Sequence, residues 1–261
     1  MPSLTSTRNP QVKQIADLKR RRMRRQHGKH LAEGPIQVLA AVAAGLVEQI
    51  VATEDGWQAL QERATREQQR KLAALTRLDV ASHVLDHVCD AQQPQGVAAV
   101  VRTTTAKLDD VVTAARFIVV DRINDPGNLG TIIRTASAFG IGDIVVTASS
   151  ADPFGPKTVR ASAGEIYRTR VCVDASADDV VRAAAGCGTR LVCLEARGTD
   201  TLAALRSASP TGLVIGSETH GVDERLLGVA GHTVAIPMPG GAESLNAAVA
   251  AAIALYEWSC P

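Results

Sequence analysis

Apolar residues recur along the chain with two different spacings, which predict alternating helices and strands over most of its length. Near the start, Asn9 followed by Pro10 predicts a helix, because asparagine is favoured at an N-cap and proline at the first helical position. More helices are expected at residues 36–44, 57–74 and 82–89, the last capped by Ser82, and short apolar strands at residues 48–52, 78–81 and 97–101. This pattern predicts a small α/β domain at residues 1–102.

A hydroxyl-rich segment follows, and residues 103–113 are predicted to be a linker because weakly apolar segments seldom pack. A second domain is expected at residues 114–261. Its predicted strands are residues 117–121, 143–147, 170–173, 190–194, 213–215 and 233–236, with helical segments between them. Such alternation is typical of an α/β fold with a mainly parallel sheet covered on both faces.

Charge is distributed unevenly, although the 28 basic and 27 acidic residues nearly balance. The first 30 residues hold nine Lys or Arg against one acid, Asp17. We expect the helix that starts at Pro10 to carry the densest run of basic residues, at positions 19–25. Its six positive charges favour contacts with RNA phosphates over a merely solvated face. The predicted RNA-binding residues are Lys19, Arg20, Arg21, Arg22, Arg24 and Arg25.

The five cysteines are scattered and none forms a Cys-x-x-Cys pair, which fits a reducing cytoplasm better than a disulfide framework. His83 and His87 have the spacing of a helical metal site but lack its glutamate, so surface histidines are favoured and no metal is expected. No signal peptide is visible, and the longest apolar stretch, residues 245–258, is too short for a bilayer. A cytoplasmic protein outside the membrane is predicted.

Three segments place glycine, proline and polar residues directly after predicted strands, where open α/β sheets bind ligands. Residues 124–130 read NDPGNLG and lead into a helix whose first turns are expected to contain Arg134. Residues 216–221 read GSETHG, with Glu218 placed to hold a cation or hydroxyl, and His220 more typical of a polar surface group. Residues 236–246 read IPMPGGAESLN and enter a helix that Ser244 is expected to cap. Each segment alone also fits an ordinary turn or packing helix.

Taken together, the order and spacing of the three segments resemble the motifs of the SpoU branch of the SPOUT methyltransferases, the TrmH-like family. The N-terminal region is similar to that family's substrate-binding domain, a ribosomal-protein-like α/β module. The resemblance covers nearly the whole chain and implies a trefoil knot in the C-terminal part of the sheet domain. It also implies a homodimer with each active site near the subunit interface.

The resemblance implies S-adenosylmethionine (AdoMet) as cofactor and a ribose 2′-hydroxyl of RNA as methyl acceptor. The residues that it places around the cofactor are Leu194, Gly216, Ile236, Met238, Leu245 and Asn246. The catalytic residues that it implies are Asn124, Arg134, Glu218, Ser244 and Asn246. A guanidinium is a poor base, so Arg134 is expected to orient a phosphate or stabilise the developing alkoxide, with Asn124 and Glu218 fixing it or the ribose.

A separate N-terminal module is associated by this resemblance with ribosomal RNA enzymes, including those that confer antibiotic resistance, more than with compact tRNA enzymes. We therefore expect methylation of 23S ribosomal RNA. A tRNA 2′-O-methyltransferase, a catalytically silent RNA-binding protein of the same fold, and a nucleotide- or NAD-binding α/β enzyme are the alternatives. The intact trio of Asn124, Arg134 and Asn246 argues against a silent protein.

Overall fold

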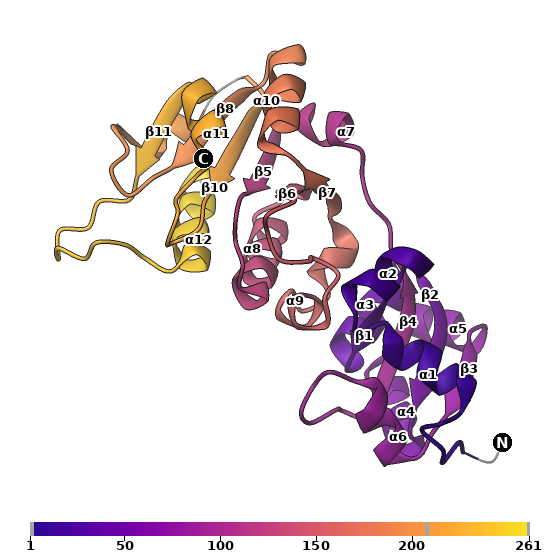
Figure 1. Cartoon of the computed structure of the whole chain (residues 1–261). Helices are drawn as coiled ribbons and strands as arrows, with labels where there is room; N and C mark the ends of the chain where they lie inside the picture. Colours follow the sequence, from indigo (N-terminus) through magenta and orange to yellow (C-terminus); the bar gives the residue numbers. More distant parts are fainter. Residues whose placement is uncertain (1–2, 207–208, 260–261) are drawn as a thin grey trace. The chain divides into compact units, whose positions relative to one another are not determined.

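The computed structural model describes residues 3–206 and 209–259, and the chain divides into two compact units. The first unit contains Met1–Thr104 together with Phe154–Tyr167, and the second contains Thr105–Pro153 and Arg168–Pro261. Figure 1 colours the chain along its sequence, so that the first unit is mainly indigo to magenta and the second mainly magenta to yellow. The first unit therefore includes a segment from the middle of the predicted second domain.

The first unit is built on a four-stranded sheet. Its strands, in spatial order, are β1 (Lys29–Glu33), β4 (Val97–Arg102), β2 (Val47–Ala52) and β3 (Thr76–Asp79). The central strand β4 runs antiparallel to both β1 and β2. Strand β1 was not predicted, and the other three strands are confirmed within a few residues.

Helices cover both faces of this sheet. Buried residues of α1 (Pro10–Asp17) and α6 (Ser82–Val88) pack on one face. Those of α3 (Pro35–Ala43), α4 (Glu54–Arg63) and α5 (Arg66–Ala73) pack on the other. A short helix α9 (Pro156–Ala161), from the late segment of the unit, lies against β1.

Three local predictions in this unit are wrong. The basic run does not continue the helix that Asn9 caps, because α1 ends at Asp17 and a separate helix α2 (Arg21–His27) carries most of the arginines. The stretch 57–74 is two helices, since Thr65 forms a capping box with Gln68 and starts α5 anew. Ser82 is the first residue of α6 and makes no capping hydrogen bond.

The second unit contains a seven-stranded sheet in which all paired strands are parallel. In spatial order its strands are β7 (Arg170–Ala175), β6 (Asp143–Thr147), β5 (Arg116–Val120), β10 (Thr211–Ile215), β8 (Arg190–Leu194), β11 (His232–Ala235) and the short β9 (Asp200–Thr201). The mainly parallel α/β sheet is confirmed, and the trefoil knot stays a prediction.

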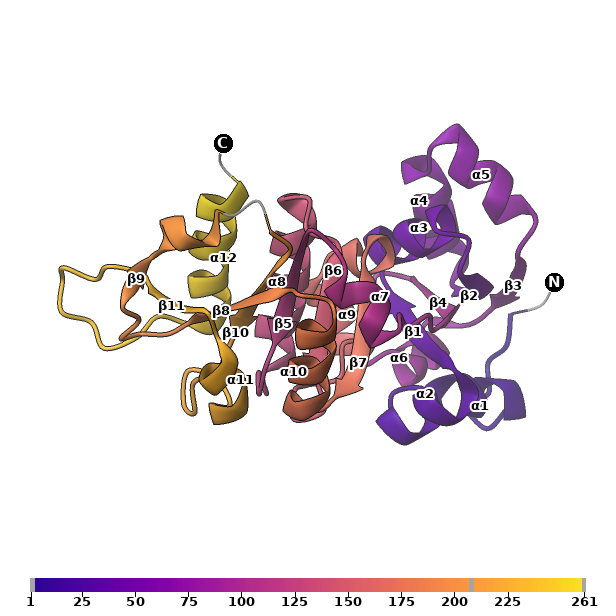
Figure 2. The ribbon, with the colours of Figure 1, turned by 90° about the horizontal axis from the view of Figure 1, so that it is seen from above.

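Helices cover both faces of this second sheet (Figure 2). One layer consists of α7 (Leu108–Val112), α10 (Ala177–Gly186) and α11 (Glu224–Val229), whose buried residues share a core with β5, β8 and β10. The opposite layer is the pair α8 (Pro126–Ala138) and α12 (Ala247–Ser259), which pack on each other. Because α7 lies within residues 103–113 and buries Val111 and Val112 completely, only part of that segment is a linker.

None of the helices in the described part of the chain combines the length and the apolar character that a bilayer crossing needs.

Candidate functional site

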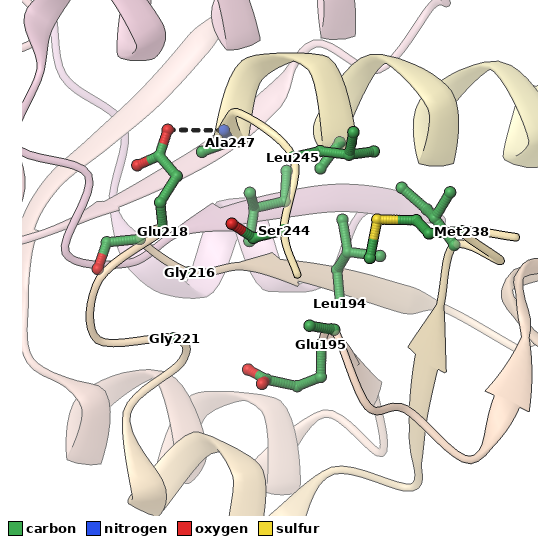
Figure 3. A pocket seen from close by; sticks show the side chains of 14 residues that line it. Leu194, Glu195, Gly216, Glu218, Gly221, Met238, Ser244, Leu245 and Ala247 are labelled. Atoms are coloured by element: carbon green, nitrogen blue, oxygen red, sulfur yellow. Dashed lines mark hydrogen bonds between the residues drawn. The ribbon is translucent and has the colours of Figure 1, made fainter. Parts of the chain in front are cut away.

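Four loops of the second unit meet at one edge of its sheet, because parallel strands all end on the same side. They follow β5, β8, β10 and β11. Between the last three of these loops and the start of α12 lies a cavity of about 270 Å³. Figure 3 shows the side chains that line it. They are Leu194, Glu195, Ala196, Ile215, Gly216, Ser217, Glu218, Gly221, Ile236, Met238, Ser244, Leu245, Ala247 and Ala250.

The loop after β10 folds back on itself so closely that its first residue must be glycine. A Cβ atom on Gly216 would lie 2.3 Å from the carbonyl carbon of Gly221, where no side chain fits. Ser217 and Gly221 exchange two backbone hydrogen bonds, of 3.2 and 2.9 Å, which close the turn. Gly221 itself has a φ of 59°. These glycines bring bare backbone to the cavity wall and hold Glu218 at the tip of the turn.

Glu218 joins the three predicted segments through one carboxylate oxygen. Its Oε1 accepts hydrogen bonds from the Asn128 side chain at 3.0 Å, from the Asn246 side chain at 3.2 Å and from the backbone N–H of Ala247 at 2.7 Å. Figure 3 shows the last of these bonds. Asn246 also donates to the Asn128 side-chain oxygen at 3.1 Å. The network fixes the loops after β5 and β10 to the start of α12.

Asn246, and not Ser244, caps α12. Its side-chain oxygen accepts from the backbone N–H groups of Ala248 at 3.0 Å and Val249 at 3.3 Å, while its amide nitrogen serves Glu218 and Asn128. The Asn246 amide therefore accepts hydrogen bonds from the start of α12 through its oxygen and donates to the Glu218 network through its nitrogen. Ser244 is free of the cap and lines the cavity instead.

A buried aspartate, Asp121, fixes the loop after β10 by a hydrogen bond to its backbone. Asp121, at the end of β5 and 2% exposed, accepts from the hydroxyl of Thr147 and from the backbone N–H of Asp223, each at 2.9 Å. The next residue, Arg122, donates to the carbonyl oxygens of His220 at 3.3 Å and Gly221 at 3.4 Å. Sequence reasoning missed both residues, although a carboxylate at the end of a buried strand is a signal that could have found Asp121.

The cavity combines an apolar wall with a few polar side chains, of which Glu195 lies opposite the Glu218 network. Leu194, Met238 and Leu245 face the interior in Figure 3, and Glu195 points toward Gly221. The Oε1 atom of Glu195 accepts from the backbone N–H of Val222 at 3.1 Å. Apolar walls with a few fixed polar groups suit a nucleoside, whose base is flat and whose sugar bears hydroxyls. Glu195 was not predicted, although it directly follows Leu194.

Two titratable groups beside the cavity have shifted pKa values. Burial raises the pKa of the Cys193 thiol to about 12, so this residue is a neutral core group and not a nucleophile. Hydrogen bonds from Arg225, first from its side chain and then from its backbone, lower the pKa of Asp223 to about 2. Asp223 thereby stays ionised and caps α11 through the backbone N–H of Arg225.

The structure brings most of the predicted site residues together, with two exceptions. Leu194, Gly216, Ile236, Met238 and Leu245 all line the cavity, with Ser244 and Glu218 beside them and Asn246 in the network.

The exceptions are Asn124 and Arg134, which are exposed and lie outside the cavity lining. Helix α8 begins at Pro126, capped by Asp125, so Arg134 sits on its third turn, about 12 Å along the axis from its start, and not in the first turns. Glu218 bonds the side chains of Asn128 and Asn246, and its role in fixing Arg134 or the ribose stays a prediction.

Two of the six predicted RNA-binding residues have structural roles in the first unit. Arg24 is buried, and its guanidinium donates to the carbonyl oxygens of Leu18 at 2.9 Å and Lys19 at 2.6 Å. Lys19 donates through its ammonium to the carbonyl oxygens of His87 and Cys89. The other four predicted residues, Arg20, Arg21, Arg22 and Arg25, are exposed.

Comparison with known proteins gives matches over both units. The model of the SpoU rRNA Methylase family matches residues 115–256, and the model of the MRM3-like substrate binding domain matches residues 9–99.

An uncharacterised tRNA/rRNA methyltransferase of Synechocystis is 32% identical over 98% of the chain and 92% of its own length. The 23S rRNA (guanosine(2553)-2′-O)-methyltransferase RlmP of Bacillus subtilis is 29% identical over 98% of both proteins. The crystal structure of an AdoMet-bound rRNA methyltransferase from Sinorhizobium meliloti superposes with a TM-score of 0.85 and 29% identity, over 98% of this chain and 97% of that one.

Proposed function

Because the chain belongs to the SpoU rRNA methylase family, we propose that it transfers a methyl group from AdoMet to a ribose 2′-hydroxyl of 23S ribosomal RNA. The observation that carries this proposal is the meeting of three segments at one sheet edge. Glu218, Asn128 and Asn246 tie the loops after β5 and β10 to the start of α12, directly beside the cavity.

The cavity supports AdoMet as the cofactor by the shape and chemistry of its lining. The close approach of Gly216 to Gly221 leaves backbone groups exposed to a ligand, and Leu194, Ile236 and Leu245 supply apolar contacts for a base. Glu195 lies where a carboxylate could accept hydrogen bonds from a ribose diol or an ammonium group. When bound, AdoMet supplies an electrophilic methyl group on a sulfonium.

Methyl transfer to an oxygen is an in-line displacement, so the protein's main task is to hold the acceptor in line. In this proposal Ser244 and Asn246 border the acceptor ribose at the mouth of the cavity. Asn128 and Glu218 set the orientation of the Asn246 amide, since both bond its nitrogen. Asn124, exposed at the end of the loop after β5, contacts the incoming nucleotide.

Arg134 acts as an electrostatic group and not as a base, because a guanidinium has a pKa above about 12 and stays charged. It orients a phosphate of the nucleotide or stabilises the oxygen as its proton leaves. Its exposed position on α8, away from the cavity of its own chain, fits contact with a large substrate or with a second subunit.

The protein acts as a homodimer in this proposal, with α12 at the subunit interface. Val249, Ile253 and Tyr256 are 49, 37 and 59% exposed and lie three to four residues apart on α12, so they form one apolar stripe. Contiguous exposed apolar surface of this kind marks an interface. Helix α8, which carries Arg134, packs against the same helix, so the dimer brings Arg134 toward the interface.

The first unit contributes RNA binding through the exposed arginines of α2 and Arg20 just before it. Positive charges on one short helix match a phosphate backbone. In this proposal the protein modifies ribosomal RNA in the cytoplasm.

The decisive experiment incubates the protein with methyl-labelled AdoMet and with separately purified 23S rRNA, 16S rRNA and tRNA, and then maps the modified nucleotide. We expect label in 23S rRNA at a ribose 2′-oxygen. Label only in tRNA, or on a base, would overturn the substrate. RNA binding without any transfer would favour the catalytically silent alternative.

A further inference from the structure

The first unit contains a cavity of about 400 Å³ that the methyl-transfer site does not use. It lies between α1 and the end of the sheet at which β1, β2 and β3 begin. Its lining residues are Gln11, Gln14, Ile15, Leu18, His27, Lys29, Glu48, Gln49, Thr76 and Val100. Its volume lies within the range of about 300–1,000 Å³ that is usual for ligand pockets.

A β-bulge shapes this cavity. In a regular strand, neighbouring side chains point to opposite faces of the sheet, so Glu48 and Gln49 should not line the same cavity. The pairing of β2 with β4 shifts between Val47 and Gln49, and both Glu48 and Gln49 line it. Bulges commonly re-aim side chains at functional positions.

The lining offers hydrogen bonds over an apolar floor and carries almost no net charge. Ile15, Leu18 and Val100, all buried, form the floor. The one strong cation, Lys29, is neutralised by Glu48, with 2.6 Å between their charged atoms. A hydrogen-bonding lining whose charges are paired favours a neutral polar ligand over a phosphate.

Three glutamine amides provide the polar groups. Gln11 donates to the side-chain oxygen of Gln49 at 3.3 Å, which orients both amides and leaves the Gln49 nitrogen with donors for a ligand. Gln14 makes no side-chain hydrogen bond to the part of the chain that the structure describes. Paired donors and acceptors at the end of a glutamine are the groups that recognise the edge of a nucleobase.

The cavity adjoins the basic helix. His27, the last residue of α2, lines it, and the exposed arginines 21, 22 and 25 lie on the same helix within about 10 Å along its axis. Phosphates can therefore bind outside the cavity while the nucleotide they belong to reaches inside. RNA-binding modules recognise sequence chiefly in unpaired nucleotides whose bases can be extruded.

We propose that this cavity binds one unpaired nucleobase of the RNA substrate, with Gln14 and Gln49 reading its edge and Ile15, Leu18 and Val100 contacting its face. The inference rests on the proposed function, because it presumes that the first unit binds RNA. It adds a site for base specificity that lies in the substrate-binding unit and is built independently of the AdoMet cavity.

The test measures binding of the full-length protein to four single-stranded RNAs of about eight nucleotides, each a homopolymer of one base, by fluorescence anisotropy. An abasic version of the preferred oligomer serves as the fifth probe. We expect the wild type to prefer one base. Gln14→Met and Gln49→Met, which keep side-chain volume, should each weaken binding of the preferred oligomer about tenfold and leave the abasic one unchanged.

Gln26→Met is the matched control, because Gln26 is an exposed glutamine of α2 that does not line the cavity. Equal wild-type affinity for all four bases would overturn the proposal, as would equal weakening of the abasic probe or the same loss in Gln26→Met. Methyl transfer to 23S rRNA is measured on the same preparations. If methyl transfer is intact but the protein shows no base preference, only this inference is wrong. If methyl transfer is absent, the proposed function is wrong.

Discussion

Glu218 accepts three hydrogen bonds on one oxygen, and its effect on activity should exceed its effect on stability. Replacing it with alanine removes one hydrogen bond each from the Asn246 amide, the Asn128 amide and the backbone N–H of Ala247, and leaves Asn246 bonded to Asn128. Because Glu218 is exposed, water can replace some of these bonds. We expect Glu218→Ala to lower the single-turnover rate of methyl transfer about 100-fold, as small misplacements of reacting groups do.

The same substitution should cost only about 1 kcal/mol in the free energy of unfolding, the usual value of a helix cap. Glu224→Ala, which removes an exposed acid at the start of α11, is the control for charge. If Glu218→Ala lost stability by several kcal/mol, or kept the wild-type rate, the positioning role would be wrong.

Asp223 makes a testable contribution to stability against acid. Its pKa in the folded protein is about 2, against an ordinary value of 3.8, because Arg225 bonds the carboxylate. A carboxyl group whose pKa is lowered by folding stabilises the protein above its unfolded pKa and loses that contribution as the pH falls toward the folded value. The contribution should therefore fade between about pH 4 and about pH 2.

We expect urea unfolding of Asp223→Asn to show weaker pH dependence than the wild type in this window, and lower stability at pH 6. Asp86→Asn, at an exposed aspartate of α6, should follow the wild-type profile. Identical profiles for Asp223→Asn and the wild type would exclude the linkage.

Among the helices, α2 carries both arginines that are proposed to bind RNA and one arginine, Arg24, that supports the fold. Arg21, Arg22 and Arg25 are exposed, whereas Arg24 is buried and bonds the carbonyl oxygens of Leu18 and Lys19. Replacing the three exposed arginines by alanine should weaken RNA binding and reduce the slope of log K against log salt by about two, since each phosphate contact contributes about 0.7 to 0.9.

Arg24→Ala should instead lower the free energy of unfolding by about 1–3 kcal/mol, because one buried and one partly buried carbonyl group lose this donor. Titrations at several salt concentrations, with thermal unfolding of the same samples, check both effects. If Arg24→Ala changes the salt slope as much as the triple variant does, the proposed division of roles among the α2 arginines is wrong.

At the scale of the whole molecule, the stripe on α12 predicts the oligomeric state. Ile253→Asp places a charge in the middle of the exposed apolar stripe and should give a monomer with lost methyl transfer. Val229→Asp is the matched control, because Val229 is likewise an exposed aliphatic residue, at 50% against 37% for Ile253, but lies at the end of α11. Sedimentation and circular dichroism measure assembly and folding, and an unchanged dimer in Ile253→Asp would contradict the proposed interface.

The first unit also depends on the late segment Phe154–Tyr167. Arg160 bonds the buried carboxylate of Glu33 at 2.5 Å, and the backbone N–H groups of Asp90 and Ala91 bond the same carboxylate. Removing one partner of a buried ion pair costs about 3 kcal/mol or more. We expect that loss for Arg160→Met in urea unfolding and almost no change for Arg182→Met, because the ion pair of Arg182 with Asp179 is exposed.

The fold class, the family and seven of the fourteen residues that line the cavity could be predicted from the sequence alone. The carboxyl ends of parallel strands lie at one edge of the sheet. The loops that follow β5, β8, β10 and β11 therefore come together there. These are consequences of local pattern and chain order.

Which side chains bond each other could not be predicted from the sequence. Asn128 and Asn246 bond Glu218, Arg24 is buried, and Asp121 bonds the loop after β10. Residues 154–167 join the first unit. Such pairings depend on where distant backbone groups come to lie, and a linear pattern of apolar and polar residues does not encode those positions.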